Sequence, residues 1–130
     1  MTVPESSEPE FRVVLPVIDD PEAFLEAVYR VVLAIPPGRV MSYGGVAAAM
    51  GTRAARQVGA IMSRQGNDLP WWRVIRADGT LPTHLAEAAL EYWEAEGTAL
   101  RRLGGHPRPA KSAFVTRVEA VFETKTAPHA

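Results

Sequence analysis

The sequence contains no cysteine among its 130 residues. Disulfide bonds, thiolate metal sites and catalysis by a thiol nucleophile are therefore excluded for this chain. It also lacks a run of about 18 apolar residues, the length that a membrane-spanning helix needs. Its amino terminus has no basic stretch followed by an apolar one. We therefore expect a soluble, cytoplasmic protein with no membrane partner.

Patterns that bind metal ions are missing as well. None of the three histidines has a partner at the spacing of metal ligands, and the carboxylates do not cluster with them. His84 is most simply a residue at the start of a helix. We therefore expect no metal ion and no cofactor.

Acidic residues are nearly absent from one segment of the chain. Residues 38–76 carry six arginines and a single acid, Asp68, for a local balance of +5. The remainder has eight basic and fourteen acidic residues, so the whole chain has a net charge of −1. Each phosphate that a basic side chain neutralises releases condensed counterions, so a local patch can drive binding to DNA. The charge distribution therefore favours a DNA-binding surface within this segment.

Length and composition predict one core with tails. With 47% hydrophobic residues the chain can bury a single core. Residues 1–10 are rich in Ser, Pro and Glu, and we expect residues 1–18 to form a flexible segment. Residues 19–97 are predicted to form the domain. Residues 98–130 are expected to be a linker and a C-terminal segment.

Capping and breaking residues predict three helices in the first half of the chain. Asp20 and Pro21 begin the first, which Pro36 and Gly38 end. Ser42 caps a short helix over residues 43–50, and Gly51 ends it. Thr52 offers a further N-cap for a helix over residues 53–64.

The last of these helices has two different faces. At about 100° per residue, one face is basic and small, and the opposite face is apolar. The basic face holds Arg53, Arg56, Gln57, Ala60 and Arg64, and the apolar face holds Ala54, Ala55, Val58, Ile61 and Met62. A recognition helix needs such a pair of faces, although an ordinary amphipathic helix shows the same periodicity.

The remaining elements complete a fold of the mainly α class. Residues 65–70 have the composition of a loop, and residues 71–75 and 80–81 flank the turn signal Asp78-Gly79. This pattern predicts a small β-hairpin, which would be the wing of a winged helix-turn-helix DNA-binding domain. A further helix is predicted over residues 84–96 and a flexible connection over residues 104–109. The spacing of apolar residues over residues 111–123 favours a helix, although the valines and the threonine there would suit a strand as well.

Short motifs in a fixed order identify a family resemblance over residues 24–97. They are Ile35-Pro36-x-Gly38, Ser42-Tyr43-Gly44, Ala54-Ala55-Arg56-x-Val58-Gly59, Pro70-x-x-Arg73-Val74-Ile75, Gly79 and Glu96-Gly97. In this order and spacing the chain resembles the DNA-binding domain of the alkylguanine-DNA alkyltransferases. In the active enzymes of this family, a cysteine follows the proline of the fourth motif and accepts the alkyl group, and the next residue is a histidine.

Here Trp71 stands at the cysteine position and Trp72 at the histidine position. An indole offers no nucleophile for alkyl transfer, and no general base stands beside it. The chain is thus not an enzyme and resembles the alkyltransferase-like proteins, which bind damaged DNA, flip the nucleotide and present it to nucleotide excision repair. The usual motif of these proteins keeps the histidine. Trp72 therefore either enlarges an apolar pocket or packs into the core.

The resemblance implies roles for the matching residues. Arg56 would enter the duplex and fill the space of the extruded nucleotide, and Tyr43 would press on the neighbouring phosphate. The lesion pocket would be formed by Trp71, Trp72, Tyr43 and Asn67. A structural role would fall to Ser42, Pro70 and Arg73. Glu96 matches a glutamate that orients the absent histidine. From helix register alone, Arg53, Gln57 and Arg64 would contact phosphates or groove edges.

Three functions therefore remain open from the sequence. The first is a non-enzymatic sensor, expected to be a monomer, whose partners are duplex DNA containing alkylated guanine and nucleotide excision repair proteins. The second is a sequence-specific winged-helix regulator, which would need base-edge donors and usually dimer symmetry. The third is a protein-interaction domain, which fits poorly with the local charge of +5. Gly59 and Ala60 beside Arg56 favour the sensor.

Overall fold

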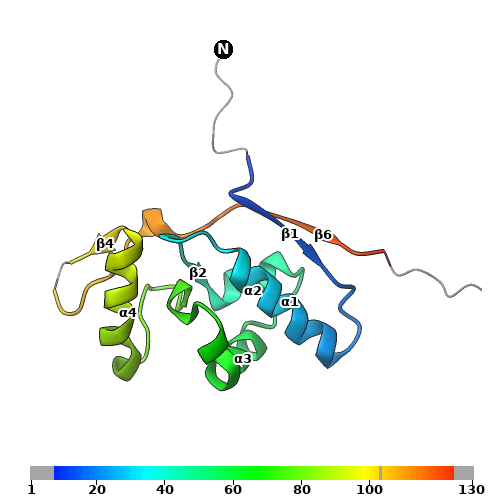
Figure 1. Cartoon of the computed structure of the whole chain (residues 1–130), viewed down its shortest axis with the longest axis horizontal. Helices are drawn as coiled ribbons and strands as arrows, with labels where there is room; N and C mark the ends of the chain where they lie inside the picture. The colour runs from blue at the N-terminus through cyan, green and yellow to red at the C-terminus, as the bar shows by residue number, and fades with distance from the viewer. Residues whose placement is uncertain (1–7, 103, 125–130) are drawn as a thin grey trace, which may run out of the picture.

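The computed structural model describes residues 8–102 and 104–124. Its helices and strands, in chain order, are β1 (Phe11–Leu15), α1 (Pro21–Ala34), β2 (Met41–Ser42), α2 (Tyr43–Ala49), α3 (Ala55–Gln65), β3 (Val74–Ile75), α4 (Thr83–Glu96), β4 (Leu100–Arg101), β5 (Arg108–Pro109) and β6 (Val118–Phe122). Single-turn 3-10 helices cover Gly66–Asp68, Trp71–Arg73 and Lys111–Ala113. Figure 1 shows α1, α2 and α3 grouped together, α4 at the opposite end, and β1 and β6 running above α1 and α2. No helix in the described ranges is long and apolar enough to cross a membrane.

The predicted caps of the first two helices are confirmed. The Asp20 carboxylate accepts a hydrogen bond from the Ala23 amide at 2.8 Å, and Pro21 opens α1. The Ser42 hydroxyl accepts from the Gly45 amide at 2.9 Å and caps α2. Such caps satisfy amides at the start of a helix that have no partner within it. Both helices therefore begin where the sequence predicted.

The third helix begins later than predicted. Thr52 does not cap it: its hydroxyl accepts from the Ala54 amide at 3.2 Å, and α3 starts at Ala55. The Thr52 amide instead donates to the Ala47 carbonyl at 3.0 Å, so this residue closes the end of α2. Arg53 therefore lies in the turn between α2 and α3 rather than in the helix.

The predicted β-hairpin over residues 71–81 does not form in the described chain. Its first half is a 3-10 turn followed by β3, and β3 pairs in parallel with β2. The Asp78-Gly79 turn is present, with Gly79 at φ 88° and the Arg76 amide donating to the Thr80 carbonyl at 3.0 Å. The return strand has no room to extend, because Pro82 already precedes α4. Val74 and Ile75 are both buried. Burial of both residues suits a strand inside the protein better than an exposed wing.

The C-terminal segment differs most from the prediction. Residues 111–123, expected to be helical, contain a 3-10 turn and strand β6. Residues 104–109, expected to be a flexible connection, include β5, which pairs antiparallel with β4. The valines of β6 are β-branched and fit a strand better than a helix, and the sequence alone did not decide between the two.

Strand β6 finds its partner at the other end of the chain. It pairs in parallel with β1, which lies in the segment expected to be flexible. Leu15 of β1 is fully buried in the core beside α1, so the expectation of flexibility is wrong for this strand. The first part of that segment, residues 1–7, lies outside the described residues.

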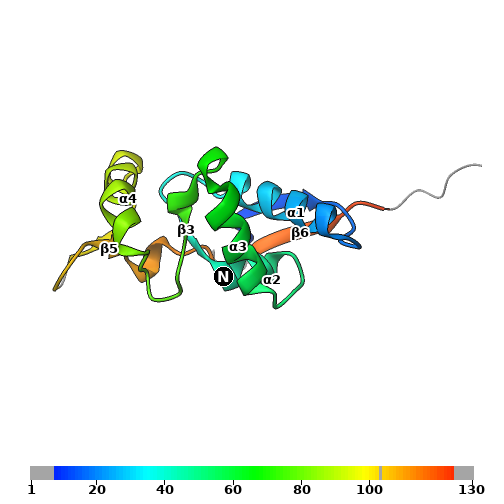
Figure 2. The ribbon, with the colours of Figure 1, turned by 90° about the horizontal axis from the view of Figure 1, so that it is seen from below.

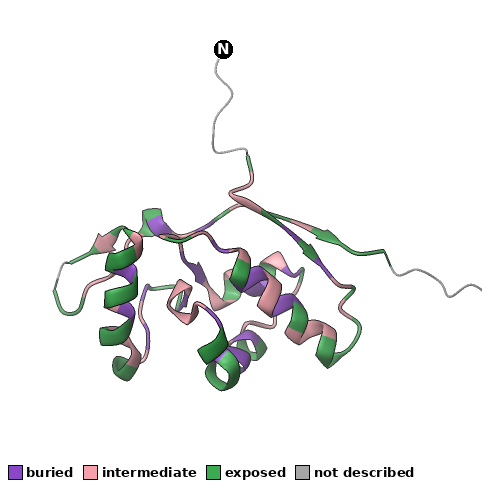
Figure 3. Cartoon of the chain, in the orientation of Figure 1, coloured by how far each residue is buried: buried purple, intermediate pink, exposed green. Residues whose placement is uncertain are grey.

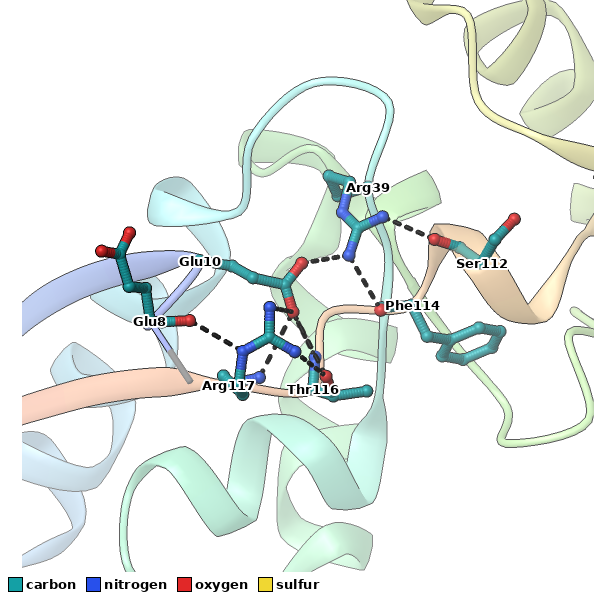
Figure 4. Close-up of polar contacts among 7 residues, drawn as sticks. All are labelled: Glu8, Glu10, Arg39, Ser112, Phe114, Thr116 and Arg117. Atoms are coloured by element: carbon teal, nitrogen blue, oxygen red, sulfur yellow. Dashed lines mark hydrogen bonds and ion pairs between the residues drawn. The ribbon is translucent and has the colours of Figure 1, made fainter. Parts of the chain in front are cut away.

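Glu10 holds the two ends of the chain together, as Figure 4 shows. Its carboxylate forms an ion pair with Arg39 and accepts hydrogen bonds from the Thr116 amide at 2.7 Å and the Arg117 amide at 3.3 Å. Burial opposes ionisation of Glu10, but these hydrogen bonds and Arg39 outweigh it and lower the pKa of the carboxyl. The contact fixes the register of β1 against β6.

The buried residues form two clusters, visible as purple stretches in Figure 3. The larger joins α1, α2 and α3 with β1, and includes Val28, Val46 and Val58. The smaller lies under α4 and includes Ile75, Leu81 and Trp93. Trp71 packs against both clusters, so it stands at the junction between the α1–α3 group and α4.

Candidate functional site

The outer face of α3 exposes the basic residues that the helical register predicted. Arg56, Gln57, Ala60 and Arg64 are exposed, whereas Val58, Ile61 and Met62 are buried. Arg53 is also exposed, in the turn before the helix. Among the described residues, Arg53, Arg56 and Arg64 form no ion pair with a carboxylate. Their charge is therefore available to an external anion.

A cavity of about 240 Å³ lies beside this face and brings together three predicted pocket residues, Tyr43, Asn67 and Trp71. We call it the Trp71 cavity. Its other lining residues are Gly59, Met62, Ser63, Gly66, Val74, Leu81, Pro82, His84 and Leu85. The view from below in Figure 2 shows β3 between α3 and α4, and these three elements supply half of the residues that line the cavity.

Two glycines of the cavity wall lie within van der Waals reach of its aromatic side chains. A Cβ atom added at Gly59 would lie 4.0 Å from the Tyr43 ring, and one at Gly66 would lie 3.6 Å from Cβ of Trp71. Burial raises the pKa of the Tyr43 hydroxyl, and the nearby Arg76 partly opposes this rise. The Tyr43 hydroxyl at the cavity is therefore neutral at physiological pH.

Trp72 does not line the Trp71 cavity. Its ring stacks on Tyr92, with centroids 3.8 Å apart and an interplanar angle of 9°. Trp71 meets both rings edge-on, at 5.7 Å from Trp72 and 5.9 Å from Tyr92. Trp72 packs against the smaller buried cluster. Trp72 is partly exposed and lies at the edge of the smaller cluster, outside the lining of the Trp71 cavity.

Glu96 joins Trp72, Arg73 and the turn at Gly38. Its carboxylate accepts from Trp72 Nε1 at 2.9 Å, from Arg73 Nη2 at 2.6 Å and Nε at 3.1 Å, and from the Gly38 amide at 3.1 Å. Burial of this carboxylate opposes its ionisation, but the hydrogen bonds, first of all from Arg73, outweigh burial and lower the pKa of Glu96. Arg73 also donates to the Ile35 carbonyl at 3.0 Å. Arg73 thus braces the loop that carries both tryptophans.

Gln57 and Arg64 line a different space from the Trp71 cavity. A groove of about 670 Å³ runs between α3 and the beginning of α1, where Phe24 and Leu25 contribute apolar surface. It shares no lining residue with the Trp71 cavity. Of the predicted DNA-binding residues, Gln57 and Arg64 therefore line the groove, whereas Tyr43 lines the Trp71 cavity. In the described ranges, no three or more His, Asp or Glu residues are grouped so that they could hold a metal ion.

Sequence analysis missed several residues of the site. The Trp71 cavity is also lined by His84, Leu81 and Leu85. The sequence pattern had assigned His84 to the start of a helix, Leu81 to the hairpin and Leu85 to the apolar face of a helix. Arg76 was counted in the basic segment without a role, yet its charge acts to lower the pKa of the Tyr43 hydroxyl. The signal that could have found Arg76 was its place directly after the tryptophan motif, in the segment with an excess of basic residues.

A comparison with protein families and curated proteins gives matches over the region that builds this site. The family model described as "6-O-methylguanine DNA methyltransferase, DNA binding domain" matches residues 23–98. A "DNA base-flipping protein" of Escherichia coli (strain K12) is 46% identical over 63 residues, which cover 46% of this chain and 49% of the relative. One of Vibrio parahaemolyticus serotype O3:K6 (strain AQ3810) is 33% identical over 88 residues, covering 64% of this chain and 88% of the relative. The match thus spans about half the length of the E. coli relative.

Solved structures resemble the fold. Atl1 of S. pombe in complex with damaged DNA containing O6-carboxymethylguanine has a TM-score of 0.65 at 27% identity, covering 76% of this chain and 99% of that one. S. pombe ATL in complex with DNA has a TM-score of 0.60 at 28% identity, covering 72% and 93%. The four helices and small strands therefore have the alkyltransferase-like arrangement.

Proposed function

Because this chain belongs to the family of the 6-O-methylguanine DNA methyltransferase DNA-binding domain, we propose that it recognises alkylated guanine in duplex DNA without repairing it. The observation that carries the proposal is the Trp71 cavity, lined by Tyr43, Asn67 and Trp71 next to the arginine-bearing face of α3. Pockets for drug-sized ligands occupy about 300–1,000 Å³. A cavity of about 240 Å³ suits the smaller size of a single extruded base.

The exposed face of α3 supplies the second part of the proposal. We assign α2 and α3 to a helix-turn-helix in which α3 approaches the DNA, with Arg53, Gln57 and Arg64 near phosphates or groove edges. Arg56 enters the duplex and occupies the space that the extruded nucleotide leaves. Extruding a base costs a few kcal/mol of stacking, and an inserted side chain offsets part of that cost.

Recognition without alkyl transfer follows from the chemistry of the site. The chain contains no cysteine, and the indoles of Trp71 and Trp72 offer neither a nucleophile nor a general base. Trp71 presents an aromatic face on which a flipped base can stack. Tyr43 presses on the phosphate beside that base. Pro70 and Arg73 hold the loop in place.

Further parts of the proposal concern the context of binding. We propose that the chain acts as a cytoplasmic monomer and that the complex with the lesion is handed to nucleotide excision repair proteins. Residues 19–97 form the DNA-binding unit. The Asp78-Gly79 turn and the β4–β5 hairpin take the place of the missing wing.

The alternative function is a sequence-specific regulator on the same scaffold. A regulator reads base edges with hydrogen-bonding side chains along its recognition helix. Here Gly59 and Ala60 lie beside Arg56 on α3, and these small residues let the helix approach the duplex closely where Arg56 enters it. The arrangement therefore favours the sensor.

One titration separates the two functions. The protein is titrated at fixed salt against two duplexes of the same sequence, one with a single O6-alkylated guanine and one without. A sensor binds the alkylated duplex more tightly, and a regulator responds to changes of sequence but not to the lesion. Equal affinity for both duplexes would refute the proposed function.

A further inference from the structure

A second cavity, of about 350 Å³, lies on the other side of Leu81 from the Trp71 cavity. We call it the basic cavity. Two arginines and a histidine, Arg76, Arg108 and His106, line it, and none of its described lining residues is a carboxylate. The hydroxyl-bearing Thr80 and Thr83 line it as well. Neither arginine forms an ion pair within the described ranges.

Asp78, an acid whose pKa both arginines lower, forms hydrogen bonds within a turn. Asp78 accepts hydrogen bonds from the Thr80 hydroxyl at 2.6 Å and the Thr80 amide at 3.0 Å. These bonds lower the pKa of the Asp78 carboxyl, and Arg108 and Arg76 lower it further from nearby. Two guanidiniums and one carboxylate leave a net charge of +1 at the cavity, and most of the guanidinium donors have no partner among the described residues. Planar guanidinium donors of this kind match the oxygens of a phosphate.

The start of α4 adds donors of the same kind. Thr83 is the first residue of this helix, and no side chain in the described part of the protein caps it. The Leu85 and Ala86 amides donate to the Pro82 carbonyl at 2.8 and 3.2 Å, and the amides of Thr83 and His84 at the positive end of the helix dipole favour an anion. Together with Arg76 and Arg108, they make the basic cavity suited to one phosphate group.

The basic cavity adjoins the Trp71 cavity. Leu81 lines both, Thr83 lines the basic cavity, and the next residue, His84, lines the Trp71 cavity. Arg76 lies close enough to Tyr43 to oppose the rise of its pKa. A DNA strand that places a base against Trp71 would therefore carry its backbone past Arg76.

The packing of β5 fixes the second arginine. Gly79 has a φ of 88°, and a Cβ atom there would lie 3.1 Å from the Pro109 carbonyl oxygen and 3.4 Å from Cδ of Arg108. The turn at Gly79 thus lies directly against β5, which brings Arg108 to the cavity. Arg108 lies beyond residues 23–98, the range of the family match.

From this geometry we propose that Arg76 and Arg108 bind a backbone phosphodiester of the DNA whose base enters the Trp71 cavity. The inference rests on the proposed function and adds the C-terminal hairpin to the DNA-binding surface. The contact is to the backbone, so it contributes to affinity for damaged and undamaged duplexes alike.

The first test is the salt dependence of binding. Wild type, Arg76→Gln, Arg108→Gln and the double variant are titrated with the undamaged and the alkylated duplex over a series of salt concentrations. Losing one phosphate contact makes the slope of log Kobs against log [salt] shallower by about 0.9. We expect the slope of the double variant to be shallower by this amount, and the slope of each single variant to change by no more than this amount. The ratio of affinities for the two duplexes should stay the same in all variants.

Arg102→Gln is the matched control, because Arg102 is exposed on the same C-terminal segment and pairs with Glu94 at 3.1 Å. Its slope should equal that of wild type. An unchanged slope in the double variant, or an equal change in Arg102→Gln, would overturn the proposal. Arg76→Lys and Arg108→Lys, which keep the charge and the aliphatic stem, should keep most of the slope and guard against misfolding.

The second test uses duplexes in which single phosphodiesters are replaced by neutral methylphosphonates. A methylphosphonate at one position near the lesion should weaken binding by wild type. The same replacement should not weaken binding by the double variant any further. If no position shows this coupling, the cavity does not bind the backbone. Loss of lesion preference in wild type would refute the proposed function, while the slopes on undamaged DNA would still test the basic cavity.

Discussion

The indole of Trp72 donates a hydrogen bond from Nε1 to Oε2 of Glu96 at 2.9 Å. By resemblance, Trp72 stands where the active enzymes have a histidine, and Glu96 matches the glutamate that orients that histidine. The carboxylate therefore accepts a hydrogen bond from an indole, which cannot act as a general base. The pair now anchors a stacked aromatic side chain instead of serving proton transfer.

Trp72→Phe tests this anchoring role. The variant keeps a ring that can stack on Tyr92 but removes the donor to Glu96. Because hydrogen bonds to charged groups contribute about 1.5–3 kcal/mol, we expect the free energy of unfolding to fall by that amount in a urea titration. In a Glu96→Gln background the same change should cost clearly less. Equal costs in both backgrounds would contradict the coupling of the two residues.

Glu96 should make stability depend on pH in the acid range. Its pKa is lowered in the folded chain from an ordinary value of 4.5, so its stabilising contribution is complete above that value and is lost as the pH falls through the folded pKa. Urea titrations of wild type and Glu96→Gln at about pH 7 and about pH 3 measure the difference. The free energy of unfolding of wild type should exceed that of Glu96→Gln by less at the lower pH. Glu10 also has a lowered pKa and contributes to both proteins, so the difference between their free energies of unfolding reports on Glu96.

Arg56 and Trp71 should contribute to lesion preference. We expect Arg56→Ala to weaken binding to the alkylated duplex more than binding to the undamaged one. Trp71→Ala should do likewise, since stacking of a base on an aromatic side chain is worth about 1–3 kcal/mol. Anisotropy titrations with both duplexes give the ratio of affinities. Trp71→Phe, which keeps an aromatic face, should retain more of the preference than Trp71→Ala.

Arg64→Ala serves as the control for this pair. A side chain that contacts phosphates weakens binding to both duplexes by the same factor. If Arg56→Ala and Trp71→Ala left the affinity ratio of wild type unchanged, the assignment of these two residues to the lesion site would be wrong.

Strand β1 should contribute to the stability of the whole chain. Leu15 is 0% exposed, whereas Val14 on the same strand is 53% exposed. Leu15→Ala should therefore cost about 2–5 kcal/mol of unfolding free energy, and Val14→Ala less than about 0.5 kcal/mol. A chemical denaturation curve for each variant measures this. Near-wild-type stability of Leu15→Ala would show that β1 is not docked in the core.

Local sequence determined the helical part of this protein. Asp20 and Ser42 cap α1 and α2, and the 3.6-residue period of α3 separates Val58 and Ile61 from Arg56, because these signals depend only on neighbours along the chain. The motif around Trp71 and the local excess of arginine likewise needed no coordinates. They located the basic face and three residues of the Trp71 cavity, Tyr43, Asn67 and Trp71.

Tertiary structure decided what depends on partners distant in sequence. Val118 to Phe122 became a strand because β1 offered its edge, and Val74 and Ile75 paired with β2 rather than folding back into a hairpin. Whether Trp72 faced a pocket or the core depended on Tyr92 and Glu96, which lie about one turn apart on α4. Strand pairing and aromatic packing are set by contacts between remote segments, and no local period in the sequence encodes them.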